Sequence, residues 1–179
     1  NSAGAAFKYG PNSDDDISFS SMSILSNAIG VETSGSGDIT MTDVTMANTE
    51  DVVINSAANV DFIEGTVDTN SVDVTGSGEF TRMRELDITL TADSSGVAGA
   101  TVTLIDASGA GAGSGVTDST GLVEGLTFVT ATVDSSGVTV PSLAGYKVMS
   151  VAEVDYSYTS SSNNIADFRY ASQLVSLTD

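Results

Sequence analysis

The chain has 179 residues, enough for one large domain or two small ones. Its 24 acidic residues outnumber 5 basic ones, so the formal net charge is −19, and the sequence contains no histidine, cysteine or tryptophan. Such a chain repels nucleic acid and anionic membranes, because both are bound through clustered Lys and Arg. Without histidine or cysteine, Ser-His-Asp and Cys-His catalysis and the usual zinc sites are excluded. No apolar run is long enough to span a membrane, so membrane insertion is not expected.

Residues 1–16 are predicted to form a lead segment before the main body of the chain. Residues 5–9 are predicted to form one short strand, which ends at the Gly-Pro pair that follows. This strand carries Phe7 and Tyr9, two aromatic side chains that suit an interface. We expect it either to cap the domain that follows or to complete a sheet in a neighbouring copy.

Three consecutive acids, Asp14, Asp15 and Asp16, close the lead segment. A solvated turn is the simpler interpretation of this run. A calcium site is the alternative, because hard cations favour clustered carboxylates. No EF-hand spacing surrounds the three acids, and calcium is the only cofactor that the sequence suggests.

Three similar stretches follow at 33–41, 54–62 and 74–82. Each has two short strand-like runs around a turn of small residues, and the stretches recur at about 20 residues, which is typical of a solenoid. One such repeat cannot bury its apolar face alone, so neighbouring coils must stack. We expect the stacked coils to extend over 17–85, starting with an incomplete first coil at Ile17.

Stacking the repeats predicts ladders of equivalent residues on successive coils. The predicted ladders are Ile39, Val60 and Phe80; Met41, Phe62 and Arg82; and Asp43, Glu64 and Arg84. Arg82 breaks an apolar ladder, so it marks either a slip in register or the capped end of the solenoid, and Arg84 is placed to pair with Glu64. Arg82 and Arg84, together with Phe7 and Tyr9, are therefore the candidate assembly residues.

This pattern resembles the right-handed parallel β-helix repeats of prokaryotic extracellular surface and filament proteins. The resemblance implies a short solenoid of about three to four coils. It also implies an extracellular or cell-surface location, and β-helix folds of this kind include carbohydrate-acting, adhesive and surface-layer proteins.

After Leu86 the 20-residue period stops and alternating strands continue to 179, with a flexible glycine-rich loop expected at 107–115 and long strands at 146–158 and 165–177. The runs GVAGATVTLID at 96–106 and GVTDSTGLV at 115–123 resemble carboxypeptidase-regulatory-like and bacterial Ig-like β-sandwiches. Their usual phrase is a G-A-x-V-x-L strand before a T-D-x-x-G turn. The resemblance implies an antiparallel Ig-like sandwich over 86–179 that serves as a spacer or adhesive unit.

Acidic residues could act in catalysis or in turns. A carboxylate pair can hydrolyse glycosides, and the candidates on the repeats are Asp38, Asp43, Asp61 and Glu64. About three coils span too little length for a groove that holds a sugar chain, so no enzyme activity is predicted. The acids in the later turns, Asp93, Asp106, Asp118 and Asp134, are explained by Asx-turn hydrogen bonding, with calcium as the alternative.

The sequence thus predicts an all-β chain, a short parallel β-helix joined to an Ig-like antiparallel sandwich. The expected function is a structural subunit of an extracellular assembly, such as a filament, a pilus-like fibre or a surface layer, with copies of itself as partners. The uncovered end coils of a short solenoid expose strand edges, and copies of the chain can pair along these edges. The alternative is an adhesin or carbohydrate-binding module of a larger secreted protein, with glycans as partners.

Overall fold

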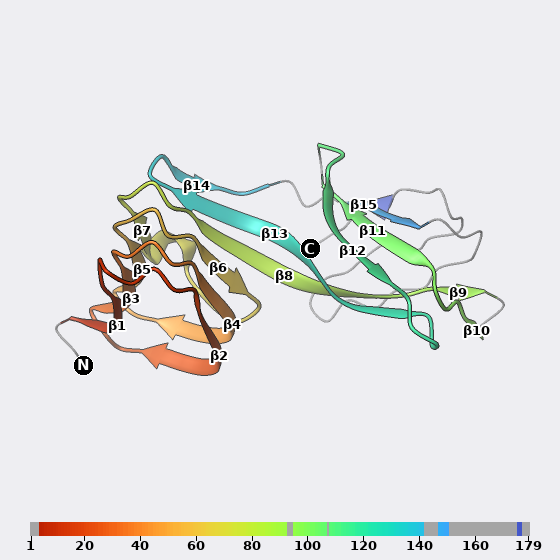
Figure 1. The fold of residues 1–179 in the computed structure, drawn as a ribbon, viewed down its shortest axis with the longest axis horizontal. Helices are drawn as coiled ribbons and strands as arrows, with labels where there is room; N and C mark the ends of the chain where they lie inside the picture. The colour runs from red at the N-terminus through yellow and green to blue at the C-terminus, as the bar shows by residue number, and fades with distance from the viewer. Residues whose placement is uncertain (1–3, 93–94, 107, 142–146, 151–174, 177–179) are drawn as a thin grey trace. The chain divides into compact units, whose positions relative to one another are not determined.

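The computed structural model describes residues 4–92, 95–106, 108–141, 147–150 and 175–176 (Figure 1). The chain divides into two compact units. Unit 1 comprises Asn1–Met83 and Val129–Val140, and unit 2 comprises Arg84–Phe128 and Pro141–Asp179. Strands make up 61% of the structure and helix only 2%, and the predicted all-β fold with a short parallel β-helix is confirmed.

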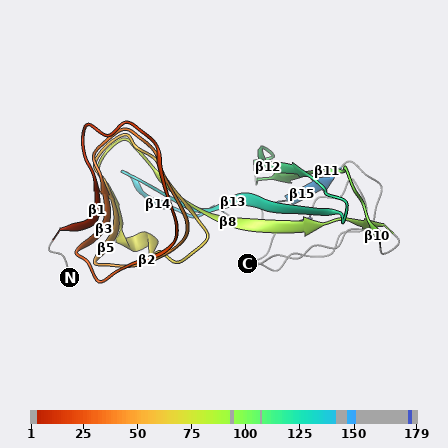
Figure 2. The same cartoon turned by 60° about the horizontal axis from the view of Figure 1, so that its bottom comes forward.

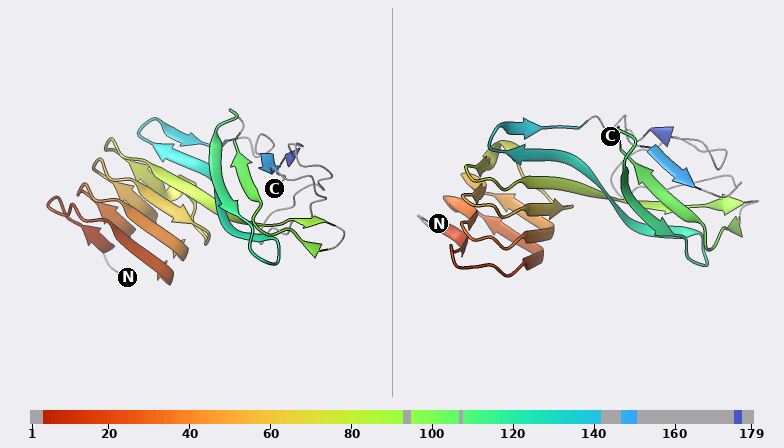
Figure 3. Two further views of the ribbon diagram at one scale, coloured as in Figure 1. Left: turned by 45° about the vertical axis from the view of Figure 1, so that its right-hand side comes forward. Right: turned by 45° about the horizontal axis from the view of Figure 1, so that its top comes forward.

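Unit 1 is a parallel β-solenoid of about four turns. Each turn contributes one strand to each of two sheets, so the coils stack as repeated loops (Figures 2 and 3). Sheet A has the order β1 (Ala5–Tyr9), β3 (Ile29–Thr33), β5 (Glu50–Ile54) and β7 (Val72–Val74). Sheet B has the order β2 (Ile17–Leu25), β4 (Ile39–Ala47), β6 (Val60–Ile63), β8 (Phe80–Thr89), β13 (Leu122–Asp134) and β14 (Gly137–Thr139).

The predicted apolar ladders are present in sheet B. Ile39 pairs with Val60 and Val60 with Phe80, while Phe62 pairs with both Met41 and Arg82 in the parallel register. Apart from Arg82, these residues are at most 1% exposed and line the interior between the sheets. The 20-residue period therefore exists because each coil must present its apolar residues directly above those of the coil before it.

Small residues form the corners between the two sheets because successive coils approach closely there. A Cβ atom at Gly76 would collide with the carbonyl oxygen of Ser56, and one at Gly78 with that of Ala58. Gly78 N–H instead donates to Ser56 O at 2.9 Å. The Gly-Ser-Gly sequence at 76–78 is thus a packing requirement of the stack.

The lead segment differs from its predicted role. Strand β1 pairs in parallel with β3, with Phe7 opposite Val31, so it is the first strand of sheet A. The solenoid starts at Ala5 rather than Ile17, and its first coil is complete. The sequence predicted a strand that caps the solenoid or completes a neighbour's sheet, because the 20-residue repeat is recognisable only from Thr33 onward.

A stacked kink runs across sheet B. Ser21, Asp43 and Glu64 have φ angles of 51°, 53° and 58°, the left-handed region that non-glycine residues rarely adopt. The flanking pairs Ser20–Thr42 and Met22–Val44 place the first two kinks side by side. The corresponding position in the fourth coil is Arg84, where β8 continues without interruption to Thr89. Strand β8 therefore leaves the solenoid period where the kink is missing.

The kink predicts that a substitution at Asp43 destabilises the protein, although Asp43 is exposed. Asp43→Val should lower the free energy of unfolding by about 1–2 kcal/mol, because a β-branched side chain is strongly strained at positive φ. Thr45→Val, two residues on in β4 and equally exposed, should change it by less than about 0.5 kcal/mol. Urea unfolding of both variants tests this, and equal stabilities would contradict the assigned backbone conformation.

Unit 2 contains small antiparallel sheets. One has the order β12 (Gly111–Val116), β11 (Thr101–Ile105), β15 (Lys147–Ser150) and β16 (Val175–Ser176), and β9 (Thr91–Ala92) pairs with β10 (Ser95–Gly96). The prediction of a flexible loop at 107–115 is wrong for residues 111–115, because these residues belong to β12, which pairs with β11 despite its glycines. Most of the two long strands predicted at 146–158 and 165–177 lies outside the described residues. The Ig-like character of this unit stays a prediction.

Candidate functional site

Two asparagine side chains from successive coils stack at one corner of the solenoid. Asn27 donates from both its backbone N and its Nδ2 to Asn48 Oδ1, each at 3.1 Å. Asn48 lies 21 positions further on and in turn donates from Nδ2 to Ile24 O at 2.8 Å. These bonds tie consecutive coils together where no strand pairing can do so.

Asp51 continues this network into the interior and is only 2% exposed. Its Oδ1 accepts from Asn48 N at 2.8 Å and from Asn48 Nδ2 at 3.1 Å. Its Oδ2 accepts from Ser71 Oγ at 2.7 Å and from Asp68 N at 3.3 Å. A buried carboxyl group with four donors is satisfied, so Asp51 joins the second, third and fourth coils through hydrogen bonds.

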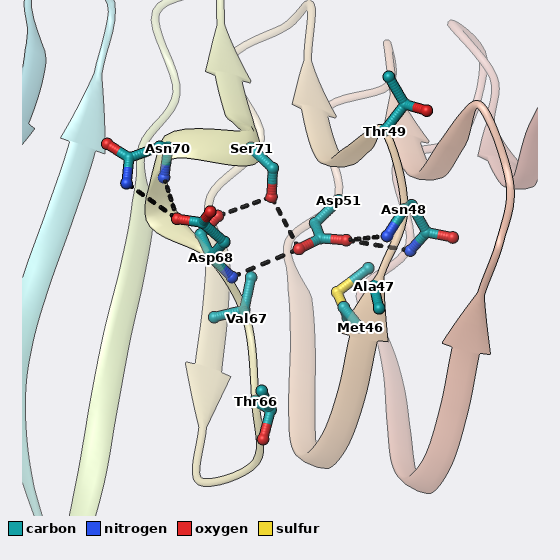
Figure 4. Close-up of a pocket in the computed structure, with 10 residues that line it drawn as sticks. All are labelled: Met46, Ala47, Asn48, Thr49, Asp51, Thr66, Val67, Asp68, Asn70 and Ser71. Carbon is teal, nitrogen blue, oxygen red and sulfur yellow. Dashed lines mark hydrogen bonds between the residues drawn. The ribbon is translucent and has the colours of Figure 1, made fainter.

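The same corner opens into a pocket next to Asp51 (Figure 4). A one-turn 3-10 helix, η1 (Thr69–Ser71), forms part of its wall, and Asp68 caps this helix by accepting from Asn70 N at 2.9 Å. The pocket is lined by Met46, Ala47, Asn48, Thr49, Asp51, Thr66, Val67, Asp68, Asn70 and Ser71. Amides, hydroxyls and one apolar patch offer hydrogen bonds and a contact surface to a small polar molecule.

Sequence analysis missed this corner. Asp51 follows Glu50 at the start of an apolar run, a position where an exposed acid is the ordinary expectation. The available signal was the repeat of Asn27 at Asn48, one solenoid period apart. That spacing does not identify the acid that lies inside, because the burial of Asp51 depends on Asp68 and Ser71 of the next coil.

The three acids Asp14, Asp15 and Asp16 are all exposed. Asp16 Oδ1 accepts from Asp38 N at 2.9 Å, and the Asp15 carbonyl accepts from the Tyr9 hydroxyl. Within the described residues, no three acidic side chains converge on a point where they could hold a metal ion. The calcium site therefore gains no support from the geometry and stays a prediction.

Of the four candidate assembly residues, Phe7 and Tyr9 lie at the first coil of the solenoid. Phe7 is 38% exposed and packs against Phe19, with ring centroids 5.0 Å apart. Tyr9 is half-buried against the core. Both belong to the inward ladders of sheet A and form its outermost layer.

The other two candidates, Arg82 and Arg84, lie near the last coil, in β8. Arg82 occupies the predicted ladder position opposite Phe62. Its carbonyl oxygen accepts from Thr130 Oγ1 of β13 at 3.2 Å, so β13 covers this side of the solenoid. Capping of the solenoid at Arg82 stays a prediction, as does the pairing of Arg84 with Glu64.

Among the candidate catalytic acids, Asp61 has the most distinctive surroundings. It lies between Thr40 and Thr81 in sheet B, and burial raises the pKa of its carboxyl group. The negative charges of Asp38 and Glu79 raise this pKa further. The remaining candidates, Asp43 and Glu64, belong to the kink instead. A raised pKa in an acidic cluster does not by itself make a catalytic site, because charge crowding in a stacked ladder produces the same shift.

Asp61 should therefore destabilise the protein at neutral pH. A carboxyl group whose pKa is raised by folding binds its proton more tightly in the folded state, so stability falls as the pH rises from the unfolded to the folded pKa. We expect Asp61→Asn to raise the melting temperature at pH 7, with the gain shrinking as the pH falls towards 4. Asp73→Asn, an exposed acid of β7, is the control. A gain independent of pH would contradict this explanation.

The later acidic turns share one hydrogen-bonding pattern. Asp118 Oδ1 accepts from Thr120 N at 2.7 Å, Thr120 Oγ1 at 2.7 Å and Leu122 N at 3.0 Å. These donors lower the pKa of Asp118, with the Thr120 hydroxyl as the largest cause. Asp106 and Asp134 show the same pattern and direction, each with a serine two residues later as the main donor. The Asx-turn interpretation of these three acids is confirmed, and Asp93 lies outside the described residues.

Comparison of the chain with protein-family models, with curated proteins and with solved structures found no match. Within the part of the chain that the structure describes, no helix is long and apolar enough to cross a membrane.

Proposed function

We propose that the chain is a structural subunit of an extracellular assembly, a filament, pilus-like fibre or surface layer, in which copies join through β contacts. One observation carries this proposal. The solenoid stack ends at β1 in sheet A and at β2 in sheet B, and within the described residues no strand lies on the outer side of either (Figure 3). Two adjacent free edges at the end of an apolar core suit strand addition from a neighbour.

The first coil also supports this proposal through its side chains. Phe7, Phe19 and Leu25 are large apolar residues of the outermost layer, and Leu25 is 49% exposed. The inner coil buries the residues paired with Phe7 and Phe19, which are Val31 and Met41. Covering this layer with another subunit would remove apolar surface from water.

The net charge sets the conditions for assembly. At −19 per chain, copies repel each other over a screening length of about 30 Å at 0.01 M salt, and over only about 3 Å at 1 M salt. An extracellular or cell-surface setting of high ionic strength therefore favours association.

We expect self-association to strengthen as the salt concentration rises from 0.01 M towards 1 M and to reverse on desalting. Light scattering across a salt titration measures this, and electron microscopy of the high-salt sample shows whether fibres or sheets form. Repeating the titration with chelator separates simple screening from bridging by divalent cations. A chain that stays monomeric at every salt concentration would remove the assembly function.

A second function, an adhesin or carbohydrate-binding module, is favoured by the pocket beside Asp51. Asn48, Asn70 and Ser71 offer amide and hydroxyl groups of the kind that bind sugar hydroxyls, and unit 2 would then serve as the Ig-like spacer. Glycan-array binding by the wild type that is lost in Asn70→Ala would support this function over assembly.

A further inference from the structure

The longest free strand edge of unit 1 carries no charge. Strand β2 has nine residues, ISFSSMSIL, without Asp, Glu, Lys, Arg or Pro. The other end strands of its two sheets are β1, which contains Lys8, β7, which contains Asp73, and β14, which has three residues. Proteins ordinarily protect long edges with charge or proline. In a chain with a net charge of −19, an uncharged edge of this length is a place where identical copies can meet without direct repulsion.

The edge also has free hydrogen-bonding groups. Ile17 N–H donates to Asp38 O on the β4 side at 3.0 Å. Because backbone groups alternate in direction along a strand, the N–H of Ser18 faces the free edge. Ser18, Ser20 and Ser23 are exposed, small and polar, so no bulky side chain shields this backbone.

We propose that β2 is a homodimer interface, in which it pairs antiparallel with β2 of a second copy about a two-fold axis near Ser21. This inference rests on the proposed self-assembling function and specifies one of its contacts, since a two-fold contact closes at two copies and a fibre needs a second contact. A two-fold axis makes the interface self-complementary, so each copy donates and accepts the same set of hydrogen bonds.

The kink in β2 determines the register of this pairing. Ser21 has a φ of 51°, so the strand consists of two extended halves, 17–20 and 22–25. The core-facing residues are Ile17 and Phe19 in the first half and Met22 and Ile24 in the second, so the kink shifts the alternation by one residue. Opposed residues of an antiparallel pair lie on the same face of the sheet, so Phe19 must lie opposite Met22 of the second copy. This register places Ser18 opposite Ser23 and brings the two kinks next to each other.

The charges next to β2 favour the antiparallel direction. Asp14, Asp15 and Asp16 directly precede the strand, whereas Ser26 and Asn27 directly follow it. Antiparallel pairing places the acidic run of each copy beside the uncharged end of the other. The two runs are then separated by about 30 Å, far more than the screening length of about 8 Å at physiological salt. Parallel pairing would bring the two runs together.

Single cysteines test this geometry directly, because the chain contains none. A mixture of Ser18→Cys and Ser23→Cys should form a mixed disulfide under mild oxidation at 1 M salt, since directly opposed residues lie within disulfide reach. Ser18→Cys alone should crosslink at least about tenfold more slowly, because its counterpart lies about five residues away along the strand, or about 17 Å. A mixture of Thr45→Cys and Ser23→Cys is the control for random collision. Equal crosslinking in all three samples, or fastest crosslinking of Ser18→Cys alone, would overturn the proposal.

A matched pair of charged variants provides a second measurement that does not depend on crosslinking. Ser23 and Thr45 are register partners on β2 and β4, and both are exposed. Ser23→Glu should weaken dimerisation by about tenfold, because two new charges enter an uncharged edge, whereas Thr45→Glu should leave it nearly unchanged. Analytical ultracentrifugation at 1 M salt measures both dissociation constants.

The outcomes separate this interface from the broader function. Association that both glutamate variants leave intact would overturn the β2 pairing, while self-assembly through another surface would stand. Absence of association at every salt concentration would remove both. Pairing of β2 with β14 of another copy, or with a different protein, would give no disulfide between Ser18→Cys and Ser23→Cys chains, and so would also overturn the proposal.

Discussion

Val60→Asp should unfold the solenoid, with a loss of more than about 4 kcal/mol in the free energy of unfolding. Val60 is fully buried, and it lies between Ile39 and Phe80 in the central ladder of sheet B. A carboxyl group there would have no hydrogen-bond donor, because its neighbours on both sides are apolar. Thermal and urea unfolding followed by circular dichroism measure the loss, and at 37 °C we expect an unfolded unit 1.

The matched control for this substitution is Val140→Asp. Val140 belongs to the same unit and is 70% exposed, so the same change of side chain meets water instead of the core. We expect its unfolding free energy to stay within about 0.5 kcal/mol of the wild type. Similar losses in both variants would show that added negative charge, and not burial, is responsible. A stable Val60→Asp protein would mean that the ladder is assigned wrongly.

The second large effect is expected at Asp51, which is buried and polar. Asp51→Ala removes the acceptor for Asn48 N and Asp68 N and leaves these backbone groups without their partner in the interior. Each unsatisfied buried donor costs about 1–3 kcal/mol, so we expect a loss of about 3 kcal/mol or more. Because the network joins the second, third and fourth coils, hydrogen exchange should accelerate in β3, β5 and β7 together.

Two variants separate the role of the Asp51 hydrogen bonds from that of its shape. Asp51→Asn keeps the volume but turns one acceptor into a donor that faces other donors, so it should lose a large part of the same stability. Asp73→Ala removes an exposed acid of β7, the strand next to β5 in sheet A, and should be nearly neutral. If Asp51→Asn were as stable as the wild type, the corner network would contribute only by filling space.

The repeat and its ladders could be predicted because the solenoid imposes a local rule on the sequence. Ile39, Val60 and Phe80 recur at about one period, and only a stack of parallel strands needs that spacing. The turns at Asp118 and Asp134 are local in the same sense, because each acid bonds to groups two to four residues ahead. Features whose physical cause lies within a few residues, or recurs at a fixed period, are therefore visible in the sequence.

The remaining features depend on tertiary contacts that no local sequence pattern specifies. Strand β1 joins sheet A because β3 offers it a free edge, and Asp51 is buried because the corner of the next coil closes over it. Strand β12 forms from glycines because β11 supplies its hydrogen bonds. By itself the sequence determined the β-solenoid period and the apolar interior, since these follow from local pattern. The tertiary structure alone decided which edges stay free and which acid lies inside, because both depend on what the neighbouring coil covers.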